Sequence, residues 1–198
     1  MPNQIKAIIF DIGGVITHFP DSKYFSYLSK LSGKDAQHVR SYIGAMIPTL
    51  EKGLMSAEEF ENKIAKRLGI TPRQVQWYSY YAKFVRVDRG VTSLVSELHK
   101  QYITAYITNI DASKYSILGK LISADIFEYK FASCYMHLRK PDKRIYEKAL
   151  KRMKVQPNQS IFIDNQEENV AGAIQAGMHS ILYKNRRLLD IELNRLLK

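Results

Sequence analysis

Cysteine is almost absent from this chain of 198 residues, since Cys134 is the only one. A single thiol excludes an intrachain disulfide and a zinc site built from several thiolates. The sequence also has no run of about 18 or more apolar residues, and its first residues lack the long apolar core of a signal peptide. We therefore expect a cytoplasmic protein that does not enter a membrane.

Acidic residues are in the minority, because 19 Asp and Glu stand against 30 Lys and Arg, for a formal net charge of +11. Such a positive field attracts nucleic acids, acidic lipids and anionic substrates alike. The basic residues are spread along helix faces that the pattern places in solvent. No zinc finger, helix-turn-helix or aromatic RNA-binding motif accompanies them. We expect no nucleic-acid partner, and the sequence leaves the formation of a homo-oligomer open.

Apolar residues make up 45% of the chain, which is enough to bury a core. Short apolar runs recur, most of them followed by a helical stretch such as the one that Pro141 opens, and such continuous runs are typical of buried parallel strands. Strands that alternate with helices predict a doubly wound, mainly parallel α/β sheet, whose sites lie at the carboxyl ends of its strands. The runs lie at 7–10, 103–107, 131–132, 161–163 and 181–183.

The first two of these runs are separated by more than ninety residues, which predicts an insertion between them. Apolar residues at helical spacing predict that the insertion, at 17–85, is a small helical bundle. Its aromatic stretch at 76–84 would pack within the bundle or line a substrate pocket. The last predicted helix begins at Thr71 and Pro72 and carries Val75, Tyr78 and Tyr81.

Polar side chains stand where several of the predicted strands end. Asp11 ends the first run before a glycine pair, Thr108 ends the second, and Asp164 ends the fourth. Lys140 lies in the loop before the following helix. Alone, each could be a turn former, a helix cap or a solvated cation. Together on one edge of a sheet, two carboxylates, a hydroxyl and an ammonium predict a site for Mg²⁺ and a phosphate group.

Four short motifs occur in an order and at a spacing that match a known family. They are FDIGGV around Asp11, ITN at 107–109, RKPD at 139–142 and FIDNQEENVAGA around Asp164. The chain thereby resembles the haloacid-dehalogenase-like hydrolases over nearly its whole length. Its first motif is most similar to that of a subgroup with sugar-phosphate phosphatases such as glucose-1-phosphatase. The resemblance implies a Rossmann-like core domain at 1–16 and 86–198, with a helical cap domain at 17–85.

The resemblance also implies a function, which is removal of phosphate from a small phosphorylated metabolite with Mg²⁺ as cofactor. Asp11 would attack phosphorus to form an aspartyl-phosphate, which water then hydrolyses. The implied metal ligands are Asp11, Asp164, the backbone carbonyl of Gly13 and the side-chain carbonyl of Asn165. The implied contacts to the substrate come from Thr108, Asn109 and Lys140, with Thr108 and Lys140 also catalytic.

Two positions depart from the family pattern. Gly13 stands where most phosphatases of the family carry an aspartate that protonates the leaving group, and losing such an acid costs about 10²- to 10⁴-fold for poor leaving groups. His18 is the nearest candidate for a substitute acid, against the alternative of a packed or solvated histidine. Asn165 replaces an acidic residue, which should weaken Mg²⁺ binding. Two alternatives therefore stay open, a metal-independent 2-haloacid dehalogenase and a catalytically weak binding or regulatory protein.

Overall fold

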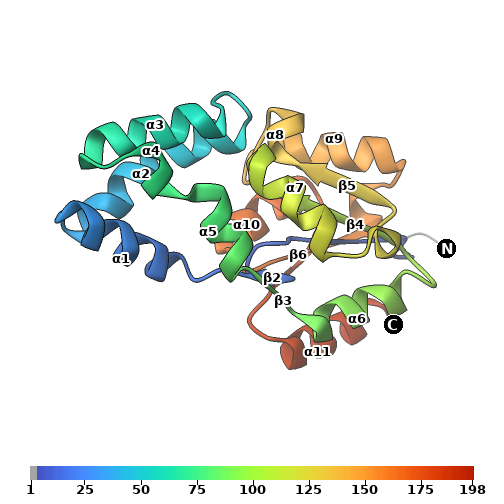
Figure 1. Ribbon diagram of the computed structural model, residues 1–198. Helices are drawn as coiled ribbons and strands as arrows, with labels where there is room; N and C mark the ends of the chain where they lie inside the picture. Colours follow the sequence, from blue (N-terminus) through green and yellow to red (C-terminus); the bar gives the residue numbers. More distant parts are fainter. Residues whose placement is uncertain (1–3) are drawn as a thin grey trace.

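The structure is a computed structural model that describes residues 4–198, and its centre is a five-stranded sheet (Figure 1). The strands follow the order β5-β4-β1-β6-β7, and every neighbouring pair is parallel. Parallel neighbours need long crossover connections, which the helices supply. The predicted α/β class and parallel sheet are confirmed. The strands are β1 (Ala7–Phe10), β4 (Ile103–Thr108), β5 (Tyr129–Ala132), β6 (Ser160–Asp164) and β7 (His179–Leu182).

Helices cover both faces of this sheet, and alternate side chains of each strand serve the two faces. Ile8 and Phe10 of β1 pack in one cluster with α6 and α11, whereas Ala7 and Ile9 pack in another with α9 and α10. Burial on both sides explains why the strands are continuous apolar runs. The covering helices are α6 (Arg89–Leu98) and α11 (Arg186–Leu196) on one face, and α9 (Lys143–Met153) and α10 (Glu167–Gln175) on the other. The connections also contain α7 (Ala112–Leu121), α8 (Ser133–Met136) and the 3₁₀ turns η1 (Ala124–Ile126) and η2 (Pro157–Gln159).

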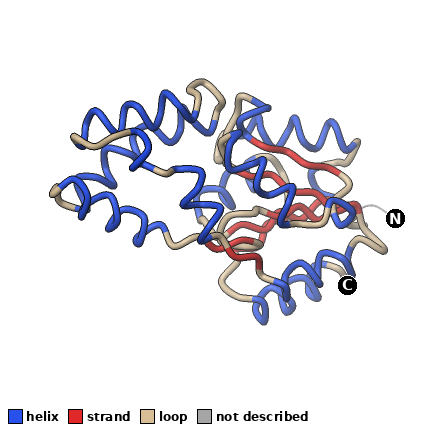
Figure 2. Tube along the Cα trace, in the orientation of Figure 1, coloured by secondary structure: helices blue, strands red, loops and turns tan. Residues whose placement is uncertain are grey.

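Between β1 and β4 the chain forms a group of helices with a core of its own, which we call the helical layer (Figure 2). Leu28, Ile43 and Ile64 are fully buried in a cluster separate from the two that cover the sheet. Two short antiparallel strands, β2 (Thr17–His18) and β3 (Arg86–Val87), pair where the chain enters and leaves this layer. Its helices are α1 (Asp21–Ser32), α2 (Ala36–Glu51), α3 (Ala57–Leu68), α4 (Pro72–Val75) and α5 (Trp77–Phe84).

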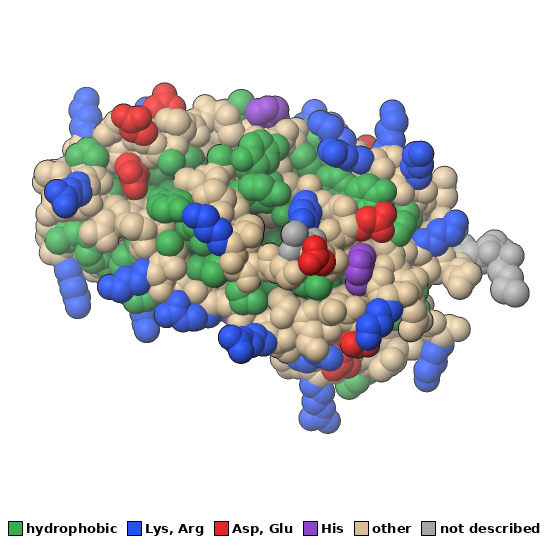
Figure 3. All heavy atoms as spheres, turned by 45° about the vertical axis from the view of Figure 1, so that its right-hand side comes forward, with side chains coloured by type: hydrophobic (Ala, Val, Ile, Leu, Met, Phe, Trp, Pro, Cys, Tyr) green, Lys and Arg blue, Asp and Glu red, His purple; other side chains and the backbone are tan. Residues whose placement is uncertain are grey.

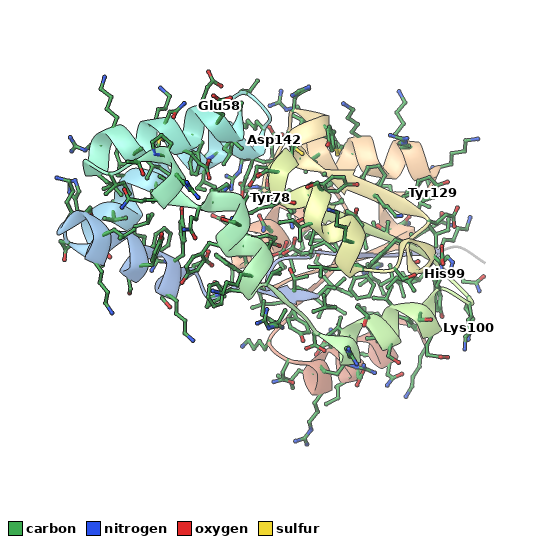
Figure 4. The ribbon with its side chains drawn as sticks, in the orientation of Figure 1. Glu58, Tyr78, His99, Lys100, Tyr129 and Asp142 are labelled. Carbon is green, nitrogen blue, oxygen red and sulfur yellow. The ribbon has the colours of Figure 1, made fainter. Side chains whose placement is uncertain are left out.

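The prediction of one continuous last helix in this region is wrong. The structure has two helices, α4 and α5, separated at Gln76, whose φ is 54°. The break is stabilised by partners distant in sequence. The hydroxyl of Tyr24 donates to the carbonyl of Val75 at 2.9 Å, and Glu61 Oε1 accepts from the backbone N–H of Trp77 at 2.8 Å. The turn rotates α5, so Tyr78, labelled in Figure 4, is 40% exposed, although the helical pattern predicted it to be buried.

Charged side chains are distributed over the surface. On the face shown in Figure 3, Lys and Arg side chains lie over the helical layer and over the sheet with its covering helices alike, with no single concentration among the residues drawn. No helix within residues 4–198 is both long enough and apolar enough to cross a bilayer.

Candidate active site

Two carboxylates meet at the carboxyl edge of the sheet, as their positions at strand ends predicted. Asp11 follows β1 and Asp164 ends β6, and these strands are direct neighbours with Phe10 opposite Ile163. The backbone N–H of Asp11 donates to the carbonyl of Ile163 at 2.7 Å, which extends the strand pairing to the site itself. A cavity of about 490 Å³ opens at this edge, between the sheet and the helical layer, and Asp11 lines it.

Lys140 bridges the two carboxylates from the neighbouring loop. Its Nζ lies 2.6 Å from Asp11 Oδ1 and 2.6 Å from Asp164 Oδ2, and the side chain is 1% exposed. Burial alone would lower the pKa of this ammonium, but the two carboxylates outweigh burial and raise it, so Lys140 stays charged. Burial raises the pKa of Asp11, and Asp164 adds to that rise, while Lys140 opposes it. The three groups are thus one coupled unit with a single ammonium between two acids.

Asn109 positions the backbone of Lys140. Its side-chain Oδ1 accepts from the Lys140 N–H at 2.8 Å, and its Nδ2 donates to the Lys140 carbonyl at 3.0 Å. Both polar atoms of the side chain therefore face Lys140, while Asn109 also lines the cavity. A direct contact between Asn109 and substrate stays a prediction. Thr108, at the end of β4, is buried and lines the same cavity.

Asp164 is held by the start of α10. Its Oδ1 accepts from the backbone N–H of Gln166 at 2.8 Å, and the Asn169 side-chain amide donates to both carboxylate oxygens at 3.1 Å. The Oδ1 of Asn169 is buried at the cavity and has no hydrogen-bond partner within residues 4–198. A buried carbonyl oxygen without a donor is unusual, and a cation or an ordered water is the usual partner of such an atom.

The glycine pair after Asp11 shapes the floor of the cavity. Gly14 has φ 87°, and a Cβ placed there would overlap the side chain of Asn165, so this position requires glycine. Gly13 differs, because its backbone is outside that region and a Cβ would meet no other atom within 4 Å. The space next to a Cβ at Gly13 is therefore open among the described residues.

These groups fit a magnesium ion by their chemistry. Mg²⁺ takes hard oxygen ligands, often only one or two carboxylates, and keeps several waters beside substrate phosphate. Asp11 and Asp164 supply two carboxylates, Asn165 lines the cavity next to them, and Asn169 adds its unpartnered oxygen. Among residues 4–198 no third Asp, Glu, His or Cys joins them to form a larger cluster. A structural zinc site is therefore not the chemistry of this donor set.

The opposite wall of the cavity comes from the helical layer and from α7. Phe19, Trp77 and Tyr81 line it, together with Lys114 on the first turns of α7. Trp77 Nε1 donates to Asp111 Oδ2 at 3.1 Å, which joins α5 to the N-terminus of α7. The sequence left open whether the aromatic stretch packs in the bundle or lines a pocket. Trp77 and Tyr81 do both, because they are buried and they also line the cavity.

A comparison with protein families matches residues 5–177 to the haloacid dehalogenase-like hydrolases. The chain belongs to this family. The resemblance drawn from the four motifs is confirmed, and the chain is an enzyme of a hydrolase family whose first and fourth motifs hold Asp11 and Asp164.

The relatives of this chain include several named phosphatases. The chain is 34% identical over 200 residues to flavin mononucleotide hydrolase 1 of Arabidopsis thaliana, covering 96% of this chain and 77% of that protein. It is 28% identical to sesquiterpene phosphatase astK of Aspergillus oryzae, covering 90% and 89%. A solved family enzyme from Bacteroides thetaiotaomicron, crystallised with magnesium and inorganic phosphate, matches with a TM-score of 0.78 at 21% identity, covering 91% and 94%. At that identity the structural match shows the fold alone.

Some features of the site were not predicted from the sequence, namely the presence of Lys114 and the bonds between Asn109 and Lys140. The bond from Asn109 to Lys140 and the placement of Lys114 beneath Trp77 join segments that are far apart along the chain. One local signal was available, because Asp111 and Lys114 lie directly after the second motif at the start of a helix. Such a spacing also suits an ordinary helix cap, and Asp111 does cap α7.

Proposed function

We propose that this protein is a Mg²⁺-dependent phosphatase that removes phosphate from a small phosphorylated metabolite through an aspartyl-phosphate. The observation that carries the proposal is the triad at the sheet edge, in which Lys140 Nζ lies 2.6 Å from both Asp11 and Asp164. A buried ammonium between two carboxylates attracts both of them, and it opposes the rise that burial causes in the pKa of Asp11. It also offers a cation to the oxygens of a phosphoryl group.

In this mechanism an oxygen of Asp11 bonds to phosphorus while the bond from phosphorus to the ester oxygen breaks. The electron pair of the broken bond goes to the ester oxygen, which takes a proton and departs as an alcohol. Water then attacks the aspartyl-phosphate, which releases phosphate and restores Asp11. The ammonium of Lys140 and the hydroxyl of Thr108 bind the phosphoryl oxygens during both displacements.

Mg²⁺ would be held by the carboxylates of Asp11 and Asp164, the backbone carbonyl of Gly13 and the side-chain carbonyl of Asn165. When bound, the ion neutralises charge on the phosphoryl oxygens as a Lewis acid. An amide oxygen carries less negative charge than a carboxylate oxygen. Asn165 therefore makes the site weaker for Mg²⁺ than a site with an acidic residue in that position.

The helical layer serves as the cap in this proposal, with the cap domain at 17–85 and the core domain at 1–16 and 86–198. Its support is the separate buried cluster of the layer and the paired strands β2 and β3 at its base. A cavity of about 490 Å³ between the two parts suits a small metabolite. Phosphosugars, suggested by the subgroup that the first motif resembles, are the first class to test. The cytoplasm is the compartment that we infer from the single cysteine, which is buried and free.

The experiment is a panel of phosphorylated metabolites assayed for release of phosphate, with Mg²⁺ and then with excess chelator. The panel holds sugar phosphates, flavin mononucleotide, alkyl, aryl and acyl phosphates. We expect metal-dependent turnover of some members, and none by Asp11→Asn. Release of chloride from a 2-haloacid without metal would instead identify a dehalogenase. Binding of a phosphorylated compound with no turnover of any member would identify a binding protein.

A further inference from the structure

The open space above Gly13 leaves the proposed reaction without a proton donor on the core side of the cavity. Apart from its two chain neighbours, no described residue has an atom within 4 Å of a Cβ built at Gly13, so no other side chain packs against this position. A substrate phosphate held at Asp11 would direct its leaving group toward the opposite wall, because attack and departure occur in line. The donor must therefore come from that wall. Beyond the triad, the titratable residues that line the cavity are His18, Asp21, Glu51, Tyr81, Asp111, Lys114 and Arg139.

Lys114 is a cation of this set whose ammonium makes no hydrogen bond or ion pair to another described residue, and aromatic rings surround it instead. Its Nζ lies 3.3 Å from the centroid of the Trp77 ring, 4.9 Å from that of Tyr81 and 5.3 Å from that of Phe19. Among the described residues it makes no ion pair, so three aromatic faces hold the ammonium in place of a carboxylate. A lysine held in this way presents its charge to the cavity and loses part of its hydration.

The acids on this wall are engaged with other groups. Glu51 is paired with Arg139 at 3.1 Å. The carboxylate of Asp111 accepts from Trp77 Nε1 at 3.1 Å and from the backbone N–H groups of Ser113 and Lys114 at 3.0 and 3.1 Å. In these bonds the carboxylate oxygens of both residues are acceptors. Burial raises the pKa of Glu51, and the charge and hydrogen bond of Arg139 oppose that rise.

The remaining candidates do not have the right position or acidity. His18, which the sequence suggested, has a side chain that is 52% exposed, with Nε2 3.8 Å from Asp88 Oδ2 at the rim. Asp21 is exposed at the start of α1, and although burial raises the pKa of its carboxyl, the charges of Lys114 and Arg40 favour the ionised form. Burial raises the pKa of Tyr81 to about 12, so its hydroxyl holds its proton too firmly for transfer near neutral pH.

We propose that Lys114 is the general acid that protonates the leaving oxygen, in place of the aspartate missing at Gly13. The inference rests on the proposed phosphatase function. In the first displacement, the ester oxygen receives the electron pair of its bond to phosphorus and takes a proton from Lys114 Nζ, which leaves an alcohol and a neutral amine. In the second, that amine takes a proton from the attacking water, which restores the ammonium as phosphate is released.

The acidity of Lys114 agrees with this role. Burial lowers the pKa of its ammonium to about 8, so the group is protonated at neutral pH yet gives up its proton far more readily than an ordinary lysine. The charged groups that face it oppose the shift, and they are Asp111 at the cap of its own helix, Asp21 on α1 and Glu51 on α2. A general acid is most effective when its pKa lies near the working pH.

The test compares alkyl and aryl phosphates in wild type, Lys114→Met, Lys114→Arg and the control Lys120→Met. Lys120 is an exposed lysine in the last turn of the same helix, so its removal changes net charge without touching the cavity. Alkyl alcohols need a proton to depart, whereas aryl oxygens leave readily without one. We expect Lys114→Met to lower the ratio of alkyl to aryl rates by about 10²- to 10⁴-fold. Lys120→Met should keep the wild-type ratio.

The arginine variant separates proton transfer from charge. Arginine keeps the positive charge and the stacking on Trp77, but it does not release its proton in proteins. The ratio should therefore also fall in Lys114→Arg, which decides the question even if Lys114→Met does not fold. In wild type, the rate with alkyl phosphates should fall above about pH 8, because the Lys114 ammonium loses its proton there. Neither Lys114 variant should show this fall.

Two results would overturn the role of Lys114. A wild-type ratio in Lys114→Arg would show that only charge matters, and a wild-type ratio in a folded Lys114→Met would assign the proton to another group. Aryl turnover that depends on Asp11 shows that the phosphatase function holds, whatever happens to the ratio. Absence of all phosphate release in wild type would refute the proposed function itself.

Discussion

The side chain of Asn109 holds the backbone of Lys140 from both sides, with Oδ1 accepting from its N–H at 2.8 Å and Nδ2 donating to its carbonyl at 3.0 Å. The two residues are 31 positions apart in the chain. This pair of bonds fixes where the loop before α9 enters the cavity, and so where the ammonium of Lys140 lies between the two carboxylates. The second and third motifs of the family thus act together in this structure.

Asn109→Leu should therefore weaken the triad without touching it. Both bonds are lost, and the N–H and carbonyl of Lys140 are left unpaired in a partly buried place, which costs about 1–3 kcal/mol for each such group. We expect a lower urea midpoint and a fall in kcat, measured with an aryl phosphate. Asn109→Asp is the matched variant, because it can still accept from the N–H of Lys140 but no longer donates to its carbonyl. A rise in KM with kcat unchanged would instead support the direct substrate contact predicted from the sequence.

Asp11→Asn tests the nucleophile. The amide has the same shape as the carboxylate, but its oxygen is a poor nucleophile toward phosphorus, so turnover should fall to background. Trapping of beryllium fluoride on the residue should be lost as well. Lys140 keeps Asp164 as a partner at 2.6 Å, so thermal unfolding should show a folded protein. Turnover that persists at the wild-type rate in this variant would rule out the aspartyl-phosphate.

Asn165→Asp tests the metal site. The new side chain has the same shape, so it fits beside Gly14 as asparagine does, and it adds a negative charge to the proposed donor set. The Mg²⁺ concentration that gives half of full activity should drop, as followed by titration of the metal. Gln101→Glu adds the same charge before β4, at the opposite edge of the sheet, and should leave the titration unchanged. Full wild-type activity in excess chelator would exclude a role for the metal.

Gly13→Asp tests whether an acid two residues after Asp11 can work in this cavity. The backbone at Gly13 admits a side chain, and the space above it is open. In wild type the gain for alkyl phosphates should be small, since Lys114 already supplies a proton. In a Lys114→Met background, Gly13→Asp should restore much of the lost alkyl rate while aryl rates change little.

The histidine suggested by the sequence has a separate test. His18→Ala should leave the ratio of alkyl to aryl rates unchanged, because the side chain faces Asp88 at the rim of the cavity. Steady-state rates for the two substrate types give the answer directly. A selective loss of alkyl turnover in this variant would assign the acid to His18.

The sequence by itself determined the parallel sheet and which side chains stand at its carboxyl edge. Continuous apolar runs are buried on both faces, and this local pattern indicates parallel strands without knowledge of their neighbours. Asp11, Thr108 and Asp164 stand where those runs end. Since the carboxyl ends of parallel strands share one edge, their convergence followed once β1, β4 and β6 were known to be adjacent. The family assignment followed from the spacing of four motifs around these residues.

The tertiary structure alone decided what faces the site from the other wall. Lys114 lies on Trp77 because α7 and α5 pack together. The apolar periodicity of the sequence does not predict a contact between these two helices. The break at Gln76 depends on Tyr24 and Glu61, which satisfy the backbone on either side of it from other helices. Periodicity reports which face of an element is buried, but an aromatic contact or a hydrogen bond to a distant residue depends on how the elements pack. For this protein, that packing buries a lysine, which lowers the pKa of its ammonium, in the cavity that Gly13 lines where most phosphatases of the family carry an acid.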